Sequence, residues 1–327
     1  MEFFNPNSNV NFMGIRRYTV AISFILMLAS IVSLATRGLN FGLDFTGGTM
    51  VEVNFAKPVD QSDITRALES AGFHGAMVQR FSATDFSIRI APKSGGESSK
   101  TQASDSESQL NAANAAVAQH VAEALATDGR QLVGKPHSEY VGPQVGKELA
   151  SNGIVAVVMV LLGIMIYIAA RFEWRFAVAT MLTELHDVIL TLGFFSITGI
   201  NFDLTVLAAV LAVDGYSVND TIVVFDRVRE LFRSSRKGGP LEILNRAVNN
   251  TLSRTIMTSL ATMITVVALY FLGGPSLHGF SLALMVGIVV GTQSSIFFAC
   301  PMLYIFGVSK QDLMPKQRDE AELARRP

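Results

Sequence analysis

Two charged residues, Asp220 and Arg254, lie inside long apolar stretches of this chain. A charge at bilayer depth costs about 2.5–3.5 kcal/mol on insertion scales, so residues of this kind usually have a function. If one apolar helix ends near Phe225 and the next starts near Thr251, both charges lie roughly 5–8 Å of helix from the same membrane surface. We therefore predict a proton relay at Asp220 and Arg254, in which a changing contact loads and releases a proton. A static ion pair that fixes helix packing is the alternative.

Polar residues close to Asp220 are candidates for supporting groups. Tyr216 and Ser217 precede Asp220 by four and three residues, so they share its helix face, and we expect them to donate hydrogen bonds to it. Asn219 is a further polar residue of the same stretch.

The preceding apolar stretch contains a second polar group, made of Glu184, His186 and Asp187. Asp214 lies nearer to mid-membrane than Asp220 and about 120° around the helix from it. This position allows Asp214 to meet His186 or Asp187 of the neighbouring helix. A His/Asp relay is one interpretation, and a packed polar cluster is the favoured alternative.

Six apolar windows must position these residues. The chain has 327 residues, of which 50% are hydrophobic and 16% charged, and a mean hydropathy of +0.38. This composition argues against a disordered chain and an ordinary soluble enzyme, and the net charge of −1 gives no reason to expect nucleic acid as a partner. A membrane-spanning helix needs about 20 mostly apolar residues. The windows run from about Tyr18 to Thr36, Gly153 to Ala170, Phe176 to Gly199, Phe202 to Phe225, Thr251 to Leu272 and Phe280 to Phe306.

Lysines and arginines in the short loops predict the orientation of these spans. They occur before the first window, between the second and third, between the fourth and fifth, and after the sixth. The short loops on the other side have none, and only Arg37, which can snorkel to the interface, disagrees. We expect both termini in the cytoplasm. The predicted division is residues 1–37 (tail and first span), 38–152 (external domain), 153–306 (five spans) and 307–327 (cytoplasmic tail).

The pattern of apolar and polar residues in 38–152 predicts a soluble α+β domain. Strands are expected at Gly48–Phe55, Ala76–Phe81, Asp85–Ala91 and Pro136–Val141, and helices at Asp60–Ala71 and Leu110–Ala126. The order βαββαβ is typical of the ferredoxin-like fold. Residues 93–108, rich in Ser, Gly and Lys, predict a flexible linker. The expected fold is thus an integral membrane bundle of six helices with one external ferredoxin-like domain.

No set of residues for covalent catalysis is evident in the sequence. His74, His120 and His137 are scattered over the external domain, and we interpret them as surface histidines. Cys300 is the only cysteine, which excludes a disulfide within the chain and a metal site built from cysteines. We expect no enzyme activity, no cofactor and no metal.

Two strips join the external domain to the spans, FGLDFTGGT (41–49) and YVGPQVGKEL (140–149). Two adjacent glycines in the first permit positive φ and so a sharp turn, and Pro143 and Gly146 in the second suggest a hinge-like connector. The strips either couple movement of the domain to the helices or are simple linkers. The candidate coupling residues are Gly42, Asp44, Gly47 and Gly48. A separate GxxxG pattern, GIVVG at 287–291, predicts close helix packing, within the chain or against a partner subunit.

Six strips in this order resemble the SecF side of the SecD/SecF family of protein-export membrane subunits. The resemblance covers essentially the whole chain. The strips are FGLDFTGGT (41–49), VGPQVGKEL (141–149), HDVILTLG (186–193), GYSVNDTIVVFDRVRE (215–230), TLSRTIMTSL (251–260) and GGPSLHGFSLALMVGIVVGTQSS (273–295).

The resemblance implies half of an RND-type transporter fold, paired with a similar half from SecD in the bacterial cytoplasmic membrane. It also implies SecYEG, SecA, YajC, membrane lipid and the translocating preprotein as partners. The essential aspartate of the family falls on Asp220 and its arginine on Arg254, and a further aspartate is expected from SecD. Glu184 and Asp214 depart from the family pattern, which usually has uncharged residues there.

The function implied is use of the proton motive force, together with SecD, to assist preprotein translocation. Two other functions are considered. A structural partner of the translocation channel would tolerate neutral substitutions at the relay residues. A proton-coupled half-transporter for small-molecule efflux would need larger external domains than about 100 residues provide.

Overall fold

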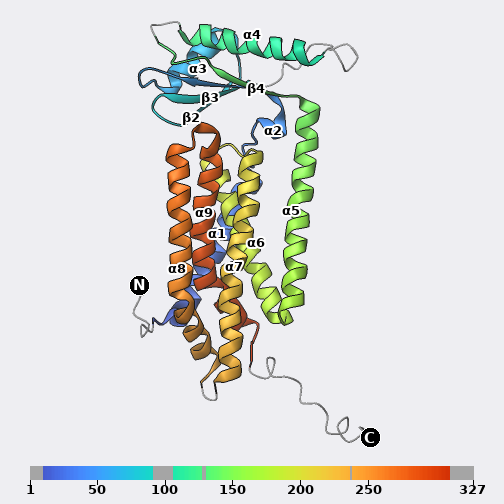
Figure 1. Cartoon of the computed structure of the whole chain (residues 1–327), viewed down its shortest axis with the longest axis vertical. Coiled ribbons are helices and arrows are strands. Elements are labelled where there is room, and N and C mark those ends of the chain that lie inside the picture. Colours follow the sequence, from blue (N-terminus) through green and yellow to red (C-terminus); the bar gives the residue numbers. More distant parts are fainter. Residues whose placement is uncertain (1–9, 91–105, 127–129, 236–237, 310–327) are drawn as a thin grey trace, which may run out of the picture.

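The computed structural model describes residues 10–90, 106–126, 130–235 and 238–309. It consists of a long helical bundle with a small α+β domain at one end (Figure 1). Most of the linker predicted at residues 93–108 lies outside the described residues.

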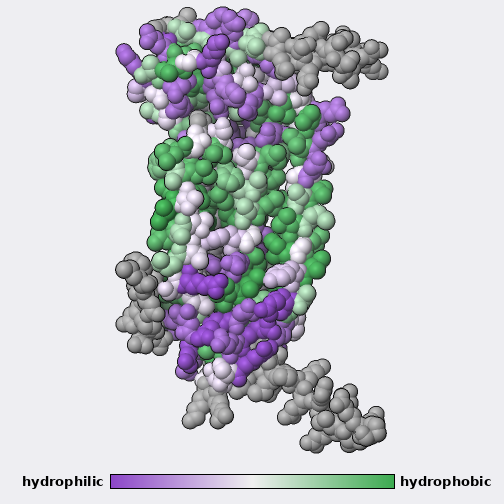
Figure 2. Space-filling model, viewed as in Figure 1, coloured by the Kyte–Doolittle hydropathy of each residue, from purple (hydrophilic) through white to green (hydrophobic). Residues whose placement is uncertain are grey.

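Within the described residues, six helices of the bundle are long and apolar enough to cross a membrane, as predicted. The first is α1 (Arg16–Thr36), preceded by a 3-10 turn, Phe12–Ile15, and the second is α5 (Pro143–Arg171). Then come α6 (Trp174–Thr198), α7 (Leu204–Ser234) and α8 (Pro240–Leu272). After a 3-10 turn, Pro275–Leu277, the last span comprises α9 (His278–Ser294), a π-helical turn (Ser295–Ala299) and α10 (Cys300–Ile305). Figure 2 shows an apolar band around the middle of the bundle, with hydrophilic residues at both ends.

Helices α7 and α8 continue well beyond the predicted spans, at the end opposite the domain. The 31 residues of α7 correspond to about 46 Å of helix, whereas the hydrocarbon core is about 30 Å thick. The helices therefore extend two to three turns past Phe225 and Thr251, where the predicted membrane spans end. The extensions are amphipathic, and they bury Phe232, Leu244 and Val248 in a core at this end of the bundle.

The α+β domain contains β1 (Gly48–Asn54), α3 (Gln61–Ser70), β2 (Met77–Arg80), β3 (Asp85–Ile90), α4 (Ser106–Ala126) and β4 (His137–Val141). The sheet is antiparallel with strand order β2-β3-β1-β4, so the ferredoxin-like prediction is confirmed. Alternation in β1 buries Val51 and Val53 against Ile64 of α3 and Val121 of α4. The other face of the sheet lies toward the bundle, across a cavity of about 290 Å³ lined by Glu52, among others.

The predicted hinge between the domain and α5 is instead the start of the helix. β4 ends at Val141 and α5 begins at Pro143, because proline at the first helical position is pre-set for the helix. Gly146 packs closely rather than providing flexibility, since an added Cβ would lie 3.0 Å from the backbone nitrogen of Gly47. The connection between β4 and α5 is therefore short and closely packed.

Candidate functional site

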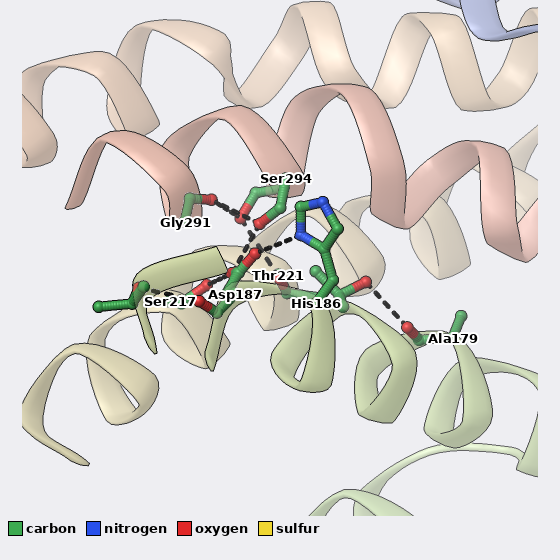
Figure 3. A network of polar contacts seen from close by, with 10 residues as sticks. Ala179, His186, Asp187, Ser217, Thr221, Gly291 and Ser294 are labelled. Carbon is green, nitrogen blue, oxygen red and sulfur yellow. Dashed lines mark hydrogen bonds and ion pairs between the residues drawn. The ribbon is translucent and has the colours of Figure 1, made fainter. Parts of the chain in front are cut away.

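A buried carboxylate, Asp187 of α6, lies at the centre of a polar network in the bundle (Figure 3). Its Oδ2 accepts hydrogen bonds from the hydroxyls of Ser217 in α7 (2.6 Å) and Ser294 in α9 (2.7 Å). Its Oδ1 lies 2.8 Å from Nδ1 of His186. Partners on three helices thus surround a carboxyl group that is 1% exposed, and they connect α6, α7 and α9.

The π-helical turn in the last span positions part of this network. Such turns insert an extra residue and often occur at functional sites. Ser295, its first residue, lies 3.3 Å from the hydroxyl of Thr221. Phe298 of the same turn stacks on the ring of His186, with 4.5 Å between the ring centroids. The turn therefore packs against the imidazole that contacts Asp187, and it pairs with a hydroxyl group of α7.

Asp220 and Arg254 lie on neighbouring helices, α7 and α8. Asp220 is 2% exposed, and Arg254 is the charged group that acts on it. The two side chains form no ion pair within 4.0 Å, and Oδ2 of Asp220 has no hydrogen-bond partner among the described residues. The guanidinium lies on the exposed flank of the bundle. The two charges thus interact electrostatically without forming a direct ion pair.

The expected donors to Asp220 contact other groups. Ser217 donates to Asp187, and the hydroxyl of Tyr216 donates to Ser259 of α8 over 3.4 Å. The predicted hydrogen bonds to Asp220 were wrong, although the three residues share one side of α7, because Ser217 and Tyr216 are turned from the direction of Asp220 by about 60° and about 40° on opposite sides. One therefore points toward α6 and α9, and the other toward α8. Asn219 is exposed.

Asp214 does not form the considered relay with His186. Its interaction partner is the carboxyl group of Glu184 in α6, and Asp187 is a further charged neighbour. His186 contacts Asp187 instead. The structure therefore contains a polar cluster with two separate parts, the Asp187 network and the Glu184–Asp214 pair.

The first strip fastens the domain to the start of α7. Its short helix α2 (Leu43–Thr46) begins after Gly42, whose amide donates to the carbonyl of Phe202 over 2.8 Å. Oδ2 of Asp44 accepts a 2.8 Å hydrogen bond from the backbone amide of Leu204, the first residue of α7. A carboxylate at this position satisfies an otherwise unpaired amide and complements the helix dipole.

The paired glycines of this strip are required by close packing and by backbone conformation. Gly47 and Gly48 have φ values of +69° and +123°. An added Cβ on Gly47 would lie 2.8 Å from Cα of Pro143 at the start of α5. The strip is thus held between the first turns of α5 and α7, and β1 starts directly at Gly48. In addition, Arg89 of β3 donates a hydrogen bond to the carbonyl of Phe41.

The GxxxG pattern packs α9 against α7 within this chain. A Cβ on Gly287 would overlap Val213, and one on Gly291 would lie 2.9 Å from Oγ of Ser217. The two glycines let the helices approach closely enough for Ser294 to reach Asp187.

Six membrane-length helices, buried acids at their contacts and an α+β domain fastened to the acid-bearing helix define a transporter-like membrane protein. A family model described as "Protein export membrane protein SecD/SecF, C-terminal" matches residues 120–309, and one described as "SecD/SecF GG Motif" matches residues 32–59. The chain belongs to the SecD/SecF family.

Relatives and solved structures agree with this assignment. The chain is 44% identical over 309 residues to protein translocase subunit SecF of Pseudomonas aeruginosa, covering 94% of this chain and 95% of the relative. It is 40% identical over 317 residues to protein translocase subunit SecF of Vibrio alginolyticus, covering 97% of this chain and 96% of that relative. The crystal structure of SecDF, a translocon-associated membrane protein from Thermus thermophilus, matches with a TM-score of 0.78 and 35% identity over 93% of this chain. A crystal structure of SecDF in a super-membrane-facing form matches with a TM-score of 0.62 and 33% identity over 97% of this chain. These matches cover 39% and 40% of the solved chains, so this chain spans about two fifths of their length.

The role of Ser294 and Phe298 was not predicted from the sequence. The polar run Thr292–Ser295 inside the last apolar window was the available signal. Hydroxyl groups in a membrane helix often bond to their own backbone, so the run alone did not indicate a shared partner on α6.

Proposed function

We propose that this chain is a protein-export subunit of the Sec machinery that converts proton flow into movement of its external domain. The chain is a multi-pass protein of the bacterial inner membrane. The names of the relatives support the export role. The arrangement of α7 supports the coupling between proton flow and movement of the domain.

One observation carries the coupling argument. The first amide of the helix that contains Asp220 donates a hydrogen bond to Asp44, a residue of the strip that leads directly into the domain sheet. About 24 Å of continuous helix separates Leu204 from Asp220. Protonation of Asp220 weakens its attraction to Arg254, α7 shifts, and the domain follows through Asp44. One charge crossing 100 mV is worth about 2.3 kcal/mol, enough to bias a conformational equilibrium of that size.

A second, SecD-type half is proposed to complete the site. Arg254 is exposed at a depth where lipid is a poor environment for a charge, and the SecDF chains that match are more than twice as long as this one. We further propose SecYEG, SecA, YajC and the translocating preprotein as partners on the basis of family membership. The loop lysines and arginines support a cytoplasmic location for both termini.

The test compares two acids of one helix in inverted membrane vesicles that contain the whole export machinery. Asp220→Asn removes the protonatable group, whereas Asp226→Asn changes an acid near the helix end that pairs with Arg171 over 3.0 Å. We expect Asp220→Asn to abolish the stimulation of preprotein translocation by an imposed proton gradient and Asp226→Asn to preserve most of it. Both variants must assemble in wild-type amounts. Full gradient-dependent translocation by Asp220→Asn would contradict the proposal and favour a structural partner of the channel.

A further inference from the structure

Glu184 of α6 and Asp214 of α7 form a buried acid pair that the proposed mechanism does not use. The two residues are 3% and 1% exposed. None of their four carboxyl oxygens has a hydrogen-bond donor within the part of the chain that the structure describes. The two groups face each other closely enough to interact by a hydrogen bond, which requires a proton on one of them. Apart from that proton, no hydrogen-bond donor in the described ranges is available to these oxygens.

The charged surroundings of the pair are acidic. On α6 the further charged neighbour is Asp187, and the imidazole of His186 is directed to Asp187 and Phe298. From α9, Ser294 donates to Asp187 rather than to the pair. No cation acts on either carboxyl group among the described residues. Two ionised carboxylates this close, without donor or counter-ion, are strongly unfavourable.

Apolar cavities give access to the pair from the lipid side. Helix α5 is the outermost helix on one side of the bundle (Figure 1). A cavity of about 300 Å³ beneath it has Asp214 as its only ionisable lining residue, and an adjoining cavity of about 300 Å³ has Glu184. The two cavities share Val158 and Leu161 of α5. The hydroxyl of Thr180, the other polar group of the second cavity, donates to the carbonyl of Phe176. An apolar reagent entering between α5 and α6 therefore meets the two acids.

We propose that Glu184 and Asp214 form a second proton-binding site, in which a carboxylic acid and a carboxylate share one proton at the base of the crevice under α5. A metal ion is a poorer ligand, because hard cations take about six oxygen ligands. No group of three or more His, Cys, Asp or Glu side chains in the described ranges is arranged to hold a metal. The site lies on the domain side of Asp220, about 9 Å nearer to the start of α7 along the helix. It does not rest on the proton role of Asp220.

The test uses dicyclohexylcarbodiimide, an apolar reagent that adds to protonated carboxyl groups. The full chain is labelled with its partner subunits in membrane vesicles, and modified peptides are identified by mass spectrometry. We expect labelling of Glu184 or Asp214 at mildly acidic and neutral pH. Above the titration range of the pair, labelling should decrease about tenfold for each further pH unit. The solvated Asp226 serves as the internal control and should remain unlabelled.

Variants and sodium separate the possible explanations. Glu184→Gln keeps the shape of the pair and donates a hydrogen bond to Asp214, so labelling should be lost at both positions. Asp220→Asn should leave labelling of the pair unchanged, which keeps this result independent of the export test. Absence of labelling in folded wild-type protein at every pH would overturn the proposal. Protection by sodium at constant pH would also overturn it, in favour of a sodium site.

Discussion

The bond between Asp44 and the first amide of α7 can be tested with a closely matched control. Asp203, the residue before α7, accepts a hydrogen bond from the amide of Val206 over 2.8 Å. Asp44 accepts one from Leu204 over the same 2.8 Å. Both bonds join a carboxylate to an end amide of the same helix. Only Asp44 belongs to the strip that continues into the sheet. Asp44→Ala therefore removes a connection between the domain and α7, whereas Asp203→Ala removes a bond within the start of α7.

The two substitutions should cost similar stability and differ in export. Hydrogen bonds to charged groups contribute about 1.5–3 kcal/mol, and loss of a helix cap typically costs about 1 kcal/mol. We therefore expect each variant to lose about 1–2 kcal/mol of unfolding free energy. If the hydrogen bond of Asp44 holds the domain and α7 together, losing about 1–2 kcal/mol shifts the equilibrium away from the state in which they are joined by about 5–30-fold. Asp203→Ala leaves this equilibrium unchanged.

The assay is gradient-stimulated translocation in vesicles, combined with hydrogen exchange at the first turns of α7. Exchange should increase in both variants, and translocation should fall only in Asp44→Ala. Asp44→Asn keeps an oxygen acceptor and should lie between Asp44→Ala and the wild type. Equal loss of translocation in the two alanine variants, or no loss in either, would refute coupling through Asp44.

Three further changes test the packing and electrostatics of the chain. Gly291→Ala places a methyl group 2.9 Å from Oγ of Ser217, so we expect a loss of about 1–3 kcal/mol in detergent unfolding. Gly163→Ala, where nothing lies within 4 Å, should be neutral. Ser294→Ala removes one of the two hydroxyl donors to Asp187 and should cost about 1–3 kcal/mol in the same assay. Burial and neighbouring acids raise the pKa of Glu52 on the open face of the sheet, although a nearby histidine opposes them. Its ionised form therefore weakens the fold as pH rises above the unfolded pKa, so Glu52→Gln should raise the melting temperature at neutral pH and not below about pH 4. A constant difference at both pH values would show that ionisation is not the cause.

The external domain was predictable because its core depends on local patterns. Val51 and Val53 alternate along one face of β1, and Ile64 and Leu68 recur at helical spacing in α3. Each pattern is complete within one element, and the order of elements then restricts the sheet to few topologies. The prediction was confirmed to within a few residues at each end.

The ends of α7 and α8 were not predictable from hydropathy. Residues beyond Phe225 include Arg227, Arg229 and Glu230, and such charges lower a window average. Phe232 of α7 and Leu244 of α8 are nonetheless buried in the same hydrophobic core. Whether an amphipathic helix continues past its apolar window depends on tertiary structure, because its apolar stripe must pack against another element.

The sequence was enough to predict which acidic residues are buried in the bundle. It was not enough to predict which residues they contact. Helical geometry limits a side chain to a direction and leaves open which helix lies there. Ser217 was assigned to Asp220 because both share one side of α7, yet the approach of α9 at Gly291 places it against Asp187. Partner choice followed from interhelical contacts that no single window contains.

These directions explain why α7 is the element whose movement matters. Asp214 faces Glu184 of α6, Ser217 faces Asp187 between α6 and α9, and Asp220 faces α8. A movement of α8 alone changes only the last of these contacts. A shift of α7 along its axis changes all of them and also pulls on Asp44 at its first amide. Packed interfaces switch between discrete arrangements rather than deforming continuously, so we propose that the charge state of Asp220 acts on the domain by moving α7 as one rigid body.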